Sequence, residues 1–552
     1  MVEQAAGRDR DAPFEGLFES PSPMSAPDQG PFQPIPEMLA HWARVQPDRP
    51  ALVCDGVTVP WAAFDRDVSR IANALIAMGF GRGDKAAVLA PPSIAYAELF
   101  FGILRAGGCV VPLSTMASPQ QLEGMIADSD SRVFFLGAGM RDLAAPFADR
   151  LDGLLPGGRI AIDFDAEGWQ PFAAWRDAAP DSDPQVEIRP EDHFNIIYSS
   201  GTTGVPKGIL HSHALRWFLI RRFEAMGYNP EAVSLVSTPF YSNTTLVAFI
   251  PTLAQGGCAV IMGKFDAARF LALAQAHRVT HAMLVPVQYE RLLVHPDFAK
   301  ADLSSFRMKL STSAPLRMET KRRIAAEWPG GMVEVYGLTE GGGSCMLDVV
   351  AHPDKLHTVG QPGFGTELKI IDDQGNELPR GQTGELVGRS FTMMSGYYRQ
   401  PDKTREMLWY DKDGRAFFRS GDMGRMDEDG FVTLLDRKKD MIISGGFNVY
   451  AADLEAVLSR HPEVADVAVI GIPSVEWGET PLALVVRKPG AGIEAEALRA
   501  WANGQLGKPQ RIAAVEFREE LPRSSIGKVL KKDLRQPYWA EVEAARAAAA
   551  SG

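Results

Sequence analysis

Residues 198–208 combine hydroxyls, glycines and one lysine in a pattern that suits a polyphosphate ligand. They follow the apolar residues 194–197 directly, so we interpret them as a loop that leaves a buried strand. Glycines let backbone N–H groups close on oxyanions, hydroxyls add neutral donors, and a lysine adds one mobile positive charge. The candidate phosphate-binding residues are therefore Ser200, Gly201, Thr202, Thr203, Gly204 and Lys207.

Two other interpretations of this loop fit less well. A P-loop requires glycine directly before its lysine and a hydroxyl directly after it, whereas Pro206 and Gly208 flank Lys207 here. A flexible Ser/Gly linker is the simpler alternative, but linkers rarely follow a buried apolar strand without a break.

A second cluster of chemically useful side chains lies at residues 336–340, directly after a strand-like segment that includes Glu334 and Val335. Tyr336 offers a face for adenine and Gly337 leaves room for an acyl chain, while Thr339 and Glu340 offer a phosphate donor and a magnesium ligand. Taken alone, the same residues also suit a surface turn with an incidental glutamate.

Together these clusters resemble the signature motifs of the adenylate-forming superfamily, which includes acyl-CoA synthetases, beetle luciferases and the adenylation domains of peptide synthetases. Four later segments resemble its remaining motifs in the same order, from about residue 35 to the end of the chain. They are the adenine-pocket turn at 311–316, the ribose-binding segment at 418–422, the hinge and glycine-bearing strand at 436–446, and the lysine motif at 521–528. The type it resembles is the acyl-CoA synthetase for fatty or aryl acids.

The resemblance implies nucleotide and CoA contacts for the matching residues. Asp422 would accept hydrogen bonds from ribose, Arg437 would contact ribose and phosphate, and Lys439 would be the pivot of the hinge. Trp477 would stack near the pantetheine arm of CoA, although a core tryptophan is an equal alternative. The remaining implied contacts are Ser313, Ala314, Pro315, Glu334, Val335, Tyr336 and Gly337 for the nucleotide, and Gly445 and Gly446 for CoA.

Four residues are the candidate catalytic groups. A carboxylate attacks an anionic triphosphate poorly, so the site must screen charge and align the reactants. Lys207 and Lys528 would supply positive charge, Thr339 a hydroxyl donor, and Glu340 a ligand for Mg²⁺. In the family the lysine at the position of Lys528 promotes adenylation.

The acid-binding residues are expected at Tyr241, Ser242 and Asn243, and after the second cluster at Gly341 and Gly342. Relatives that activate amino acids have an aspartate in the first of these segments, so its absence here disfavours an amino acid. Ser242 replaces a histidine that is common in acyl-CoA synthetases. The glycines would leave an open pocket floor for a long or wide acid, although a mobile turn is the plainer explanation.

Composition excludes several classes of protein. The chain has 552 residues, a formal net charge of −12, 45% hydrophobic residues and only four cysteines. Its acidity disfavours nucleic acid as a partner, and the scattered cysteines suggest neither disulfides nor a zinc site. The N-terminus lacks the features of a signal peptide, and no uninterrupted apolar run is long enough to span a membrane. We therefore expect a cytoplasmic protein.

The predicted fold is α/β: a large N-terminal domain of layered α/β sheets with a β-rich subdomain, followed by a small mobile α+β C-terminal domain. Strand and helix alternate up to about residue 285, which predicts a parallel sheet covered on both faces. Tight turns and short strands beyond residue 360 predict antiparallel pairing. The expected boundaries are a disordered arm at 1–30, the adenylation domain at 31–436 and the mobile domain at 437–552.

The sequence thus predicts an acid:CoA ligase that uses ATP, Mg²⁺ and coenzyme A and forms an acyl-adenylate. Its substrate would be an apolar, non-amino acid: an aryl, arylpropenoic or medium- to long-chain fatty acid. One alternative is an enzyme that donates its acyl-adenylate to a carrier protein, although no carrier domain follows Lys528 in the sequence. The other is a degenerate nucleotide-binding regulator. The oligomeric state stays open, with a homodimer as one alternative.

Overall fold

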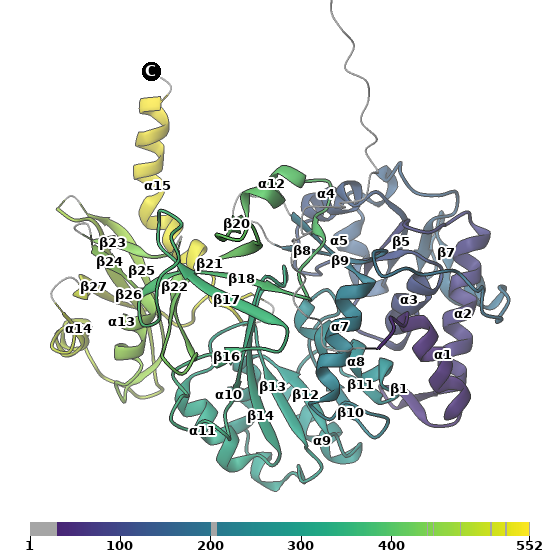
Figure 1. Cartoon of the computed structure of the whole chain (residues 1–552), viewed down its shortest axis with the longest axis horizontal. Helices are drawn as coiled ribbons and strands as arrows, with labels where there is room; N and C mark the ends of the chain where they lie inside the picture. The colour runs from purple at the N-terminus through teal and green to yellow at the C-terminus, as the bar shows by residue number, and fades with distance from the viewer. Residues whose placement is uncertain are drawn as a thin grey trace, which may run out of the picture.

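The structure is a computed structural model that describes residues 30–199, 207–438, 440–444, 447–474, 476–507, 510–524 and 527–550 (Figure 1). Several expectations fall on residues outside these ranges. They are the N-terminal arm up to residue 29, the loop residues Ser200, Gly201, Thr202, Thr203 and Gly204, the pivot Lys439, and the glycines Gly445 and Gly446.

An eight-stranded sheet positions the phosphate loop, with the order β19-β9-β8-β4-β3-β5-β6-β7. Its strands are β3 (Lys85–Leu89), β4 (Cys109–Pro112), β5 (Ser131–Leu136), β6 (Arg159–Ala161), β7 (Gln170–Pro171), β8 (His193–Ser199), β9 (Lys207–Ser212) and β19 (Gly396–Tyr397). The helices α2 (Trp61–Ala77), α3 (Ile94–Arg105), α4 (Pro119–Asp128), α5 (Arg141–Ala144), α6 (Phe172–Asp177) and α7 (His213–Glu224) lie within the same part of the chain.

The centre of this sheet is parallel as predicted, but its β9 edge is not. β9 runs antiparallel to β8, with Ser199 paired to Lys207, and β19 is antiparallel to β9. The phosphate loop therefore joins two antiparallel strands. Lys207 lies on the returning strand, which fixes its backbone in the sheet.

A nine-stranded sheet carries the second motif, in the order β16-β15-β14-β13-β12-β10-β11-β1-β2. Its strands are β1 (Pro50–Cys54), β2 (Val57–Pro60), β10 (Val233–Val236), β11 (Cys258–Ile261), β12 (His281–Leu284), β13 (Met308–Ser311), β14 (Gly331–Gly337), β15 (Ser344–Asp348) and β16 (Gln361–Pro362). Its helices are α1 (Ile35–Val45), α8 (Asn243–Ala254), α9 (Ala267–Ala276), α10 (Pro286–Leu293) and α11 (Met318–Glu327). Short 3₁₀ helices cover Ala138–Met140, Ala148–Arg150 and Phe298–Lys300.

The two large sheets share one apolar core through the helices between them. Phe100 and Phe101 of α3 and Phe249 of α8 are fully buried in a cluster that includes residues from both sheets. Burial of each such ring contributes about 2–3 kcal/mol. The two large sheets, which carry the first two motifs, are therefore packed against one another through a shared core.

Antiparallel strands follow residue 365, as the sequence predicts. A five-stranded sheet contains β17 (Thr366–Ile371), β18 (Thr383–Ser390), β20 (Leu408–Tyr410), β21 (Ala416–Met426) and β22 (Val432–Arg437), with α12 (Pro401–Glu406) beside it. A fourth sheet contains β23 (Ile442–Ser444), β24 (Phe447–Val449), β25 (Val464–Ser474), β26 (Gly478–Arg487) and β27 (Ala514–Phe517). Its helices are α13 (Ala451–Leu458), α14 (Ala495–Asn503) and α15 (Lys531–Ala550).

Figure 1 places this last sheet and its helices at one end of the molecule, beyond β17, β21 and β22, with α1 and α2 at the opposite end. The four cysteines are free thiols, so no disulfide joins these parts. Within the described ranges, none of the helices has the length and apolar character needed to cross a membrane.

Candidate active site

Three of the four candidate catalytic residues lie together where the β8–β9 pair meets the end of β14. The ring of Tyr397 links them, because its hydroxyl donates to Glu340 Oε1 at 3.0 Å and Lys207 Nζ lies 5.1 Å from its centroid. His211 Nε2 on β9 lies 2.8 Å from the backbone oxygen of Thr339. Burial and the Glu340 carboxylate raise the pKa of Tyr397, so its hydroxyl remains a donor. The arrangement presents a cation, a hydroxyl and a carboxylate at one place.

The predicted ribose contact Asp422 is a buried carboxylate with two strong partners. Tyr336 donates its hydroxyl to Oδ2 at 2.6 Å, and Arg437 Nε lies 2.6 Å from Oδ1. Burial raises the pKa of Asp422, while Arg437, Tyr336 and Lys528 oppose that rise. The charge of Lys528 therefore acts on Asp422, which places this lysine on the same side of the molecule as the predicted ribose contact.

The predicted adenine turn is fixed from two sides. Ser313 has φ of +78°, a left-handed conformation that a glycine would adopt without strain, and its hydroxyl lies 2.5 Å from Thr244 Oγ1 on α8. Glu334 accepts a hydrogen bond from the Leu316 amide at 2.9 Å and lies 2.5 Å from Lys321 Nζ. Because both oxygens of Glu334 are engaged within the protein, its contacts support the turn. Ala314 and Pro315 lie between these two anchors.

The turn that bears Lys528 packs on the N-terminal part of the chain. Gly527 has φ of +77°, and a Cβ at this position would lie 2.7 Å from Val287 Cγ1 on α10. Arg523 donates to the Gly527 oxygen at 2.7 Å and also bonds to Asp466, whose other oxygen lies 2.8 Å from Arg317. Sequence reasoning missed this Arg317–Asp466–Arg523 bridge, because its members lie in three separate segments and outside any motif.

Sequence reasoning also missed a buried polar network behind the site. Arg216 of α7 donates to Asn195 Oδ1 at 2.8 Å, to His211 Nδ1 at 2.9 Å and to Asn243 Oδ1 at 3.1 Å. Because Nδ1 of His211 accepts a hydrogen bond, Nε2 carries the proton and donates it to Thr339. Burial, and then Arg216, lower the pKa of His211 well below its usual value, so the ring is neutral. The sequence signal that could have revealed this network is the presence of Asn195 and His211 within otherwise apolar strand segments.

The predicted acid-binding residues lie at the start of α8. Ser242 is buried and precedes the helix, while Tyr241 and Asn243 on either side of it are half-buried. Asn243 is linked to Thr339 by hydrogen bonds, because Arg216 bonds to both Asn243 and His211 and His211 bonds to the Thr339 oxygen. The structure therefore brings the acid-side segment and the second motif together through shared polar partners.

The predicted open pocket floor at Gly341 and Gly342 is wrong. A Cβ at Gly341 would lie 1.7 Å from the Thr392 oxygen, and one at Gly342 would lie 2.2 Å from Phe418 Cβ. The space that side chains would fill is already occupied by neighbouring strands and loops. Glycine is needed here for close packing of the backbone, and no open volume results from it.

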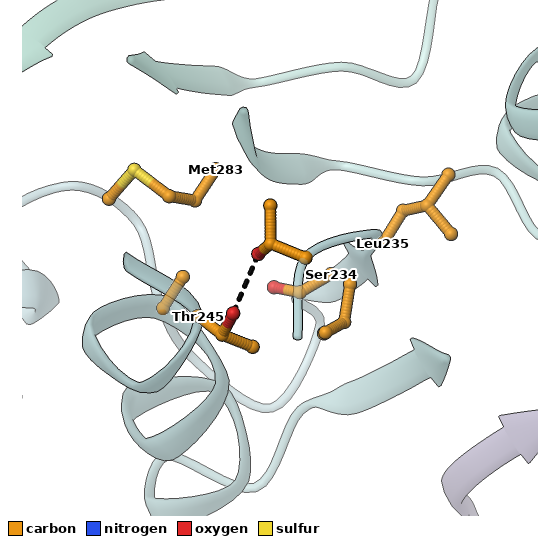
Figure 2. A pocket seen from close by; sticks show the side chains of 7 residues that line it. Ser234, Leu235, Thr245 and Met283 are labelled. Carbon is orange, nitrogen blue, oxygen red and sulfur yellow. Dashed lines mark hydrogen bonds between the residues drawn. The ribbon is translucent and has the colours of Figure 1, made fainter. Parts of the chain in front are cut away.

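A small cavity lies between α8 and the nine-stranded sheet (Figure 2). Its volume is about 10 Å³, the space that a single water molecule requires. Its lining mixes apolar groups with hydroxyls, and Thr238 and Thr245 are hydrogen-bonded at 2.7 Å. The lining residues are Ser234, Leu235, Val236, Thr238, Thr245, Ala248 and Met283. An acyl chain does not fit into this volume.

Trp477 is exposed, so the alternative of a core tryptophan is wrong. Its side chain is 47% exposed, and Ile443 and Phe447 on β23 and β24 are exposed as well. The register places this turn beside β23, because Gly478 pairs with Ser444. An exposed aromatic at this position is available to a ligand.

Comparison with known proteins identifies relatives over almost the whole chain. The AMP-binding enzyme family matches residues 39–398, and the AMP-binding enzyme C-terminal domain matches residues 453–528. A feruloyl-CoA synthase of an Amycolatopsis species is 33% identical over 507 residues, which cover 91% of this chain and 99% of that relative. A long-chain-fatty-acid–CoA ligase of Mycobacterium tuberculosis is 32% identical over 519 residues, covering 92% and 98% of the two chains.

This chain is also similar to a relative that is named for transfer to an acyl carrier protein. A fatty acid–[acyl-carrier-protein] ligase of Streptomyces coeruleorubidus is 31% identical over 521 residues, covering 92% of this chain and 97% of that relative. Among solved structures, ATP-bound MatB from Rhodopseudomonas palustris superposes with a TM-score of 0.82 at 30% identity, covering 92% and 99% of the two chains.

Proposed function

Because this chain belongs to the AMP-binding enzyme family, we propose that it is an ATP-dependent acid:CoA ligase that works through an acyl-adenylate. The observation that carries the proposal is the meeting of Lys207, Thr339 and Glu340 around Tyr397. The charge of Lys528 also acts on Asp422, the predicted ribose contact. The curated relatives named above support an apolar, non-amino acid as the substrate. The acid itself is an aryl, arylpropenoic or fatty acid.

The first half-reaction joins the acid to the nucleotide. A carboxylate oxygen attacks the α-phosphorus of ATP, pyrophosphate leaves, and an acyl-AMP anhydride forms. Lys207 and Lys528 offset the negative charge that gathers on the phosphate oxygens, and the hydroxyl of Thr339 donates to one of them. Because His211 fixes the backbone of Thr339, that hydroxyl is placed before the nucleotide arrives.

The residues present fit a magnesium ion that is shared with ATP. Mg²⁺ is commonly held by one or two carboxylates together with substrate phosphates, and Glu340 offers one carboxylate at this place. Among the described residues, no group of three or more acidic, His or Cys side chains forms a cage for a metal. We propose that Glu340 holds the ion, which when bound polarises the phosphate oxygens.

The second half-reaction transfers the acyl group to a thiol. The CoA sulfur attacks the acyl carbonyl of the anhydride, a thioester forms, and AMP leaves. We propose that residues 437–552 rotate about the hinge at Lys439 between the two half-reactions, so that the strand with Gly445 and Gly446 replaces Lys528 at the site. The exposed Trp477 beside that strand supports a place for the pantetheine arm. The free thiols suit a reducing compartment, and we propose the cytoplasm.

Pyrophosphate release across a panel of acids tests the ligase proposal. Wild-type protein should release pyrophosphate with at least one apolar acid, and AMP and thioester should then accumulate only when CoA is added. Lys528→Ala should lower adenylation by at least about 100-fold, the loss typical of one electrostatic group, while thioester formation from preformed acyl-adenylate survives. Equal loss of both half-reactions would argue against the role of Lys528.

Comparing CoA with an acyl carrier protein as the acceptor distinguishes the CoA ligase from the alternative that donates to a carrier protein. If CoA gives no thioester but an acyl carrier protein does, the enzyme is an acyl-adenylate donor to carriers, as the Streptomyces relative is named. Absence of pyrophosphate release with every acid would favour a nucleotide-binding regulator. Binding of ATP without turnover would then be the expected calorimetric result.

A further inference from the structure

Ser313 has a strained backbone in the turn that we propose for adenine. Its φ of +78° lies in the left-handed region, where the Cβ of any residue other than glycine crowds the following carbonyl oxygen. Glycine adopts this conformation without strain, so serine at this position has a cost in stability that glycine would not have. Strained residues of this kind persist only where their surroundings hold them, and they cluster at functional sites.

The side chain of Ser313 is held by helix α8. Ser313 Oγ lies 2.5 Å from Thr244 Oγ1, and Thr244 is a buried residue in the first turn of that helix. Within the described part of the chain, this is the only hydrogen bond between the turn at 311–316 and the segment at 239–245. The strained serine therefore joins two segments that lie far apart in the sequence.

Each of the two segments is also fixed to its own surroundings. Glu334 accepts a hydrogen bond from the Leu316 amide at 2.9 Å, which holds the far end of the turn. Thr245 donates its hydroxyl to the Pro239 oxygen at 2.6 Å, which holds the start of α8. Because neither of these anchors connects the segments, the hydroxyl pair is the polar contact that sets their relative position.

The two segments serve different substrates in the proposed function. Thr244 directly follows the proposed acid-binding residues 241–243, whereas Ser313 lies in the turn proposed for adenine. A substrate that orders one segment therefore also restricts the other segment through the hydroxyl pair. The second substrate then loses less conformational freedom when it binds, which is a positive coupling between the two sites.

We propose that Ser313 is a positioning residue that couples the binding of ATP and of the acid through its hydrogen bond to Thr244. This inference rests on the proposed ligase function and adds that each substrate tightens the binding of the other. Because coupling between two ligands is reciprocal, the same factor applies in both directions. Glycine has no hydroxyl and cannot make this link, which accounts for a strained serine at this position.

Equilibrium binding with a nucleotide that does not react measures the coupling. The nucleotide is α,β-methylene-ATP with Mg²⁺, which cannot form an acyl-adenylate. The acid is the one that releases pyrophosphate fastest in the panel, which includes 4-hydroxy-3-methoxycinnamic acid and dodecanoic acid. Calorimetry gives the Kd of this acid with and without the nucleotide analogue. Wild-type protein should bind the acid about fivefold more tightly with the analogue, as expected for one hydrogen bond.

Ser313→Gly and Thr244→Val should each reduce this factor to about one, although they differ in stability. Ser313→Gly relieves the left-handed strain, so its Tm should stay within about 3 °C of wild type, whereas Thr244→Val keeps the strain and should lower Tm further. The double variant should lose no more coupling than either single variant, because both changes remove the same bond. A merely structural role would make the loss of coupling follow the loss of Tm.

Thr252→Val is the matched control. Thr252 is a buried threonine near the other end of α8, and its hydroxyl donates to Ser234 at 2.7 Å. Loss of this hydroxyl should lower Tm and leave the coupling factor as it is in wild type.

Two results would overturn the inference while the ligase function stands. One is an acid affinity of wild-type protein that does not depend on the nucleotide analogue. The other is a coupling factor that stays unchanged in Ser313→Gly and Thr244→Val. If no acid of the panel releases pyrophosphate with wild-type protein, the proposed function and this inference fail together.

Discussion

The carboxylate that we expect to bind ribose is already held by a phenol. Tyr336 donates to Asp422 at 2.6 Å, and Arg437 holds the other oxygen. Tyr336→Phe removes one of these two restraints and keeps the aromatic ring that we expect to face adenine. The expected result is a KM for ATP that rises about three- to tenfold with kcat within about twofold, because one neutral hydrogen bond contributes about 1 kcal/mol.

The control for this change is Tyr410→Phe. Tyr410 is a 54% exposed tyrosine of β20, so loss of its hydroxyl should leave the steady-state constants unchanged. An unchanged KM in Tyr336→Phe, or a loss confined to kcat, would contradict a role of this pair in binding the nucleotide.

His211 should act through Thr339. His211→Phe leaves the Thr339 oxygen and an Arg216 donor without their partner. The free energy of unfolding should fall by about 1–3 kcal/mol, the cost of a buried polar group left unpaired. Adenylation should slow while the KM for CoA stays constant, since CoA binds in the other half-reaction. His277→Phe, at the end of α9, is the control, and urea denaturation with pyrophosphate release measures both effects.

At the scale of elements, helices α2, α3 and α6 share buried charges away from the site. Glu98 of α3 is buried near Asp67 of α2, and Arg176 of α6 donates to its carboxylate at 3.1 Å. Burial, and then the Asp67 charge, raise the pKa of Glu98 from 4.5 to about 7. The folded state therefore keeps a proton that the unfolded state has lost between these two pH values.

The raised pKa of Glu98 in the folded state determines how the free energy of unfolding changes with pH. Because the native state binds more protons, this group's contribution to stability falls as pH rises from about 4.5 to about 7. Glu98→Gln should remove that fall and make the protein more stable than wild type at pH 8, by about 1–3 kcal/mol. Denaturation at pH 5 and pH 8 measures it, and a gain that is equal at both pH values would contradict the assignment. Glu187→Gln, at an exposed position, is the control.

Local patterns predicted most elements, and long-range pairing accounts for what they missed. Short apolar runs predicted the strands β3, β4, β10 and β12, and helical periodicity predicted the helices between them. These patterns depend only on neighbouring residues in the sequence. The antiparallel return of β9 and the packing of Gly342 on Phe418 depend on partners far along the chain. The Asn195–His211–Arg216 network was missed for the same reason. The motifs placed Lys207, Thr339 and Glu340 together, but only the fold supplies Tyr397 between them.

At the scale of the whole molecule, the bridge through Asp466 holds the last sheet against α11. Arg317, just before that helix, and Arg523, in the turn that leads to Lys528, both bind this one carboxylate. The side chains of Arg317 and Asp466 are 43% and 23% exposed, so the pair contributes about 1 kcal/mol or less and weakens with salt. A contact of this strength favours one arrangement of the two parts without locking it, which is compatible with the domain rotation that we propose.

Asp466→Ala should therefore shift the balance between the two half-reactions. Loss of about 1 kcal/mol lowers the ratio of docked to undocked arrangements about fivefold, so adenylation should slow by at most that factor. Thioester formation from preformed acyl-adenylate should stay constant or become faster, because it requires the undocked arrangement. Glu496→Ala is the control. It removes an ion pair within α14, a helix that belongs to the same domain as Asp466, and it should change neither rate. If Asp466→Ala slows both half-reactions equally, the bridge supports folding only, and the docked arrangement of Lys528 depends instead on the contact of Gly527 with α10.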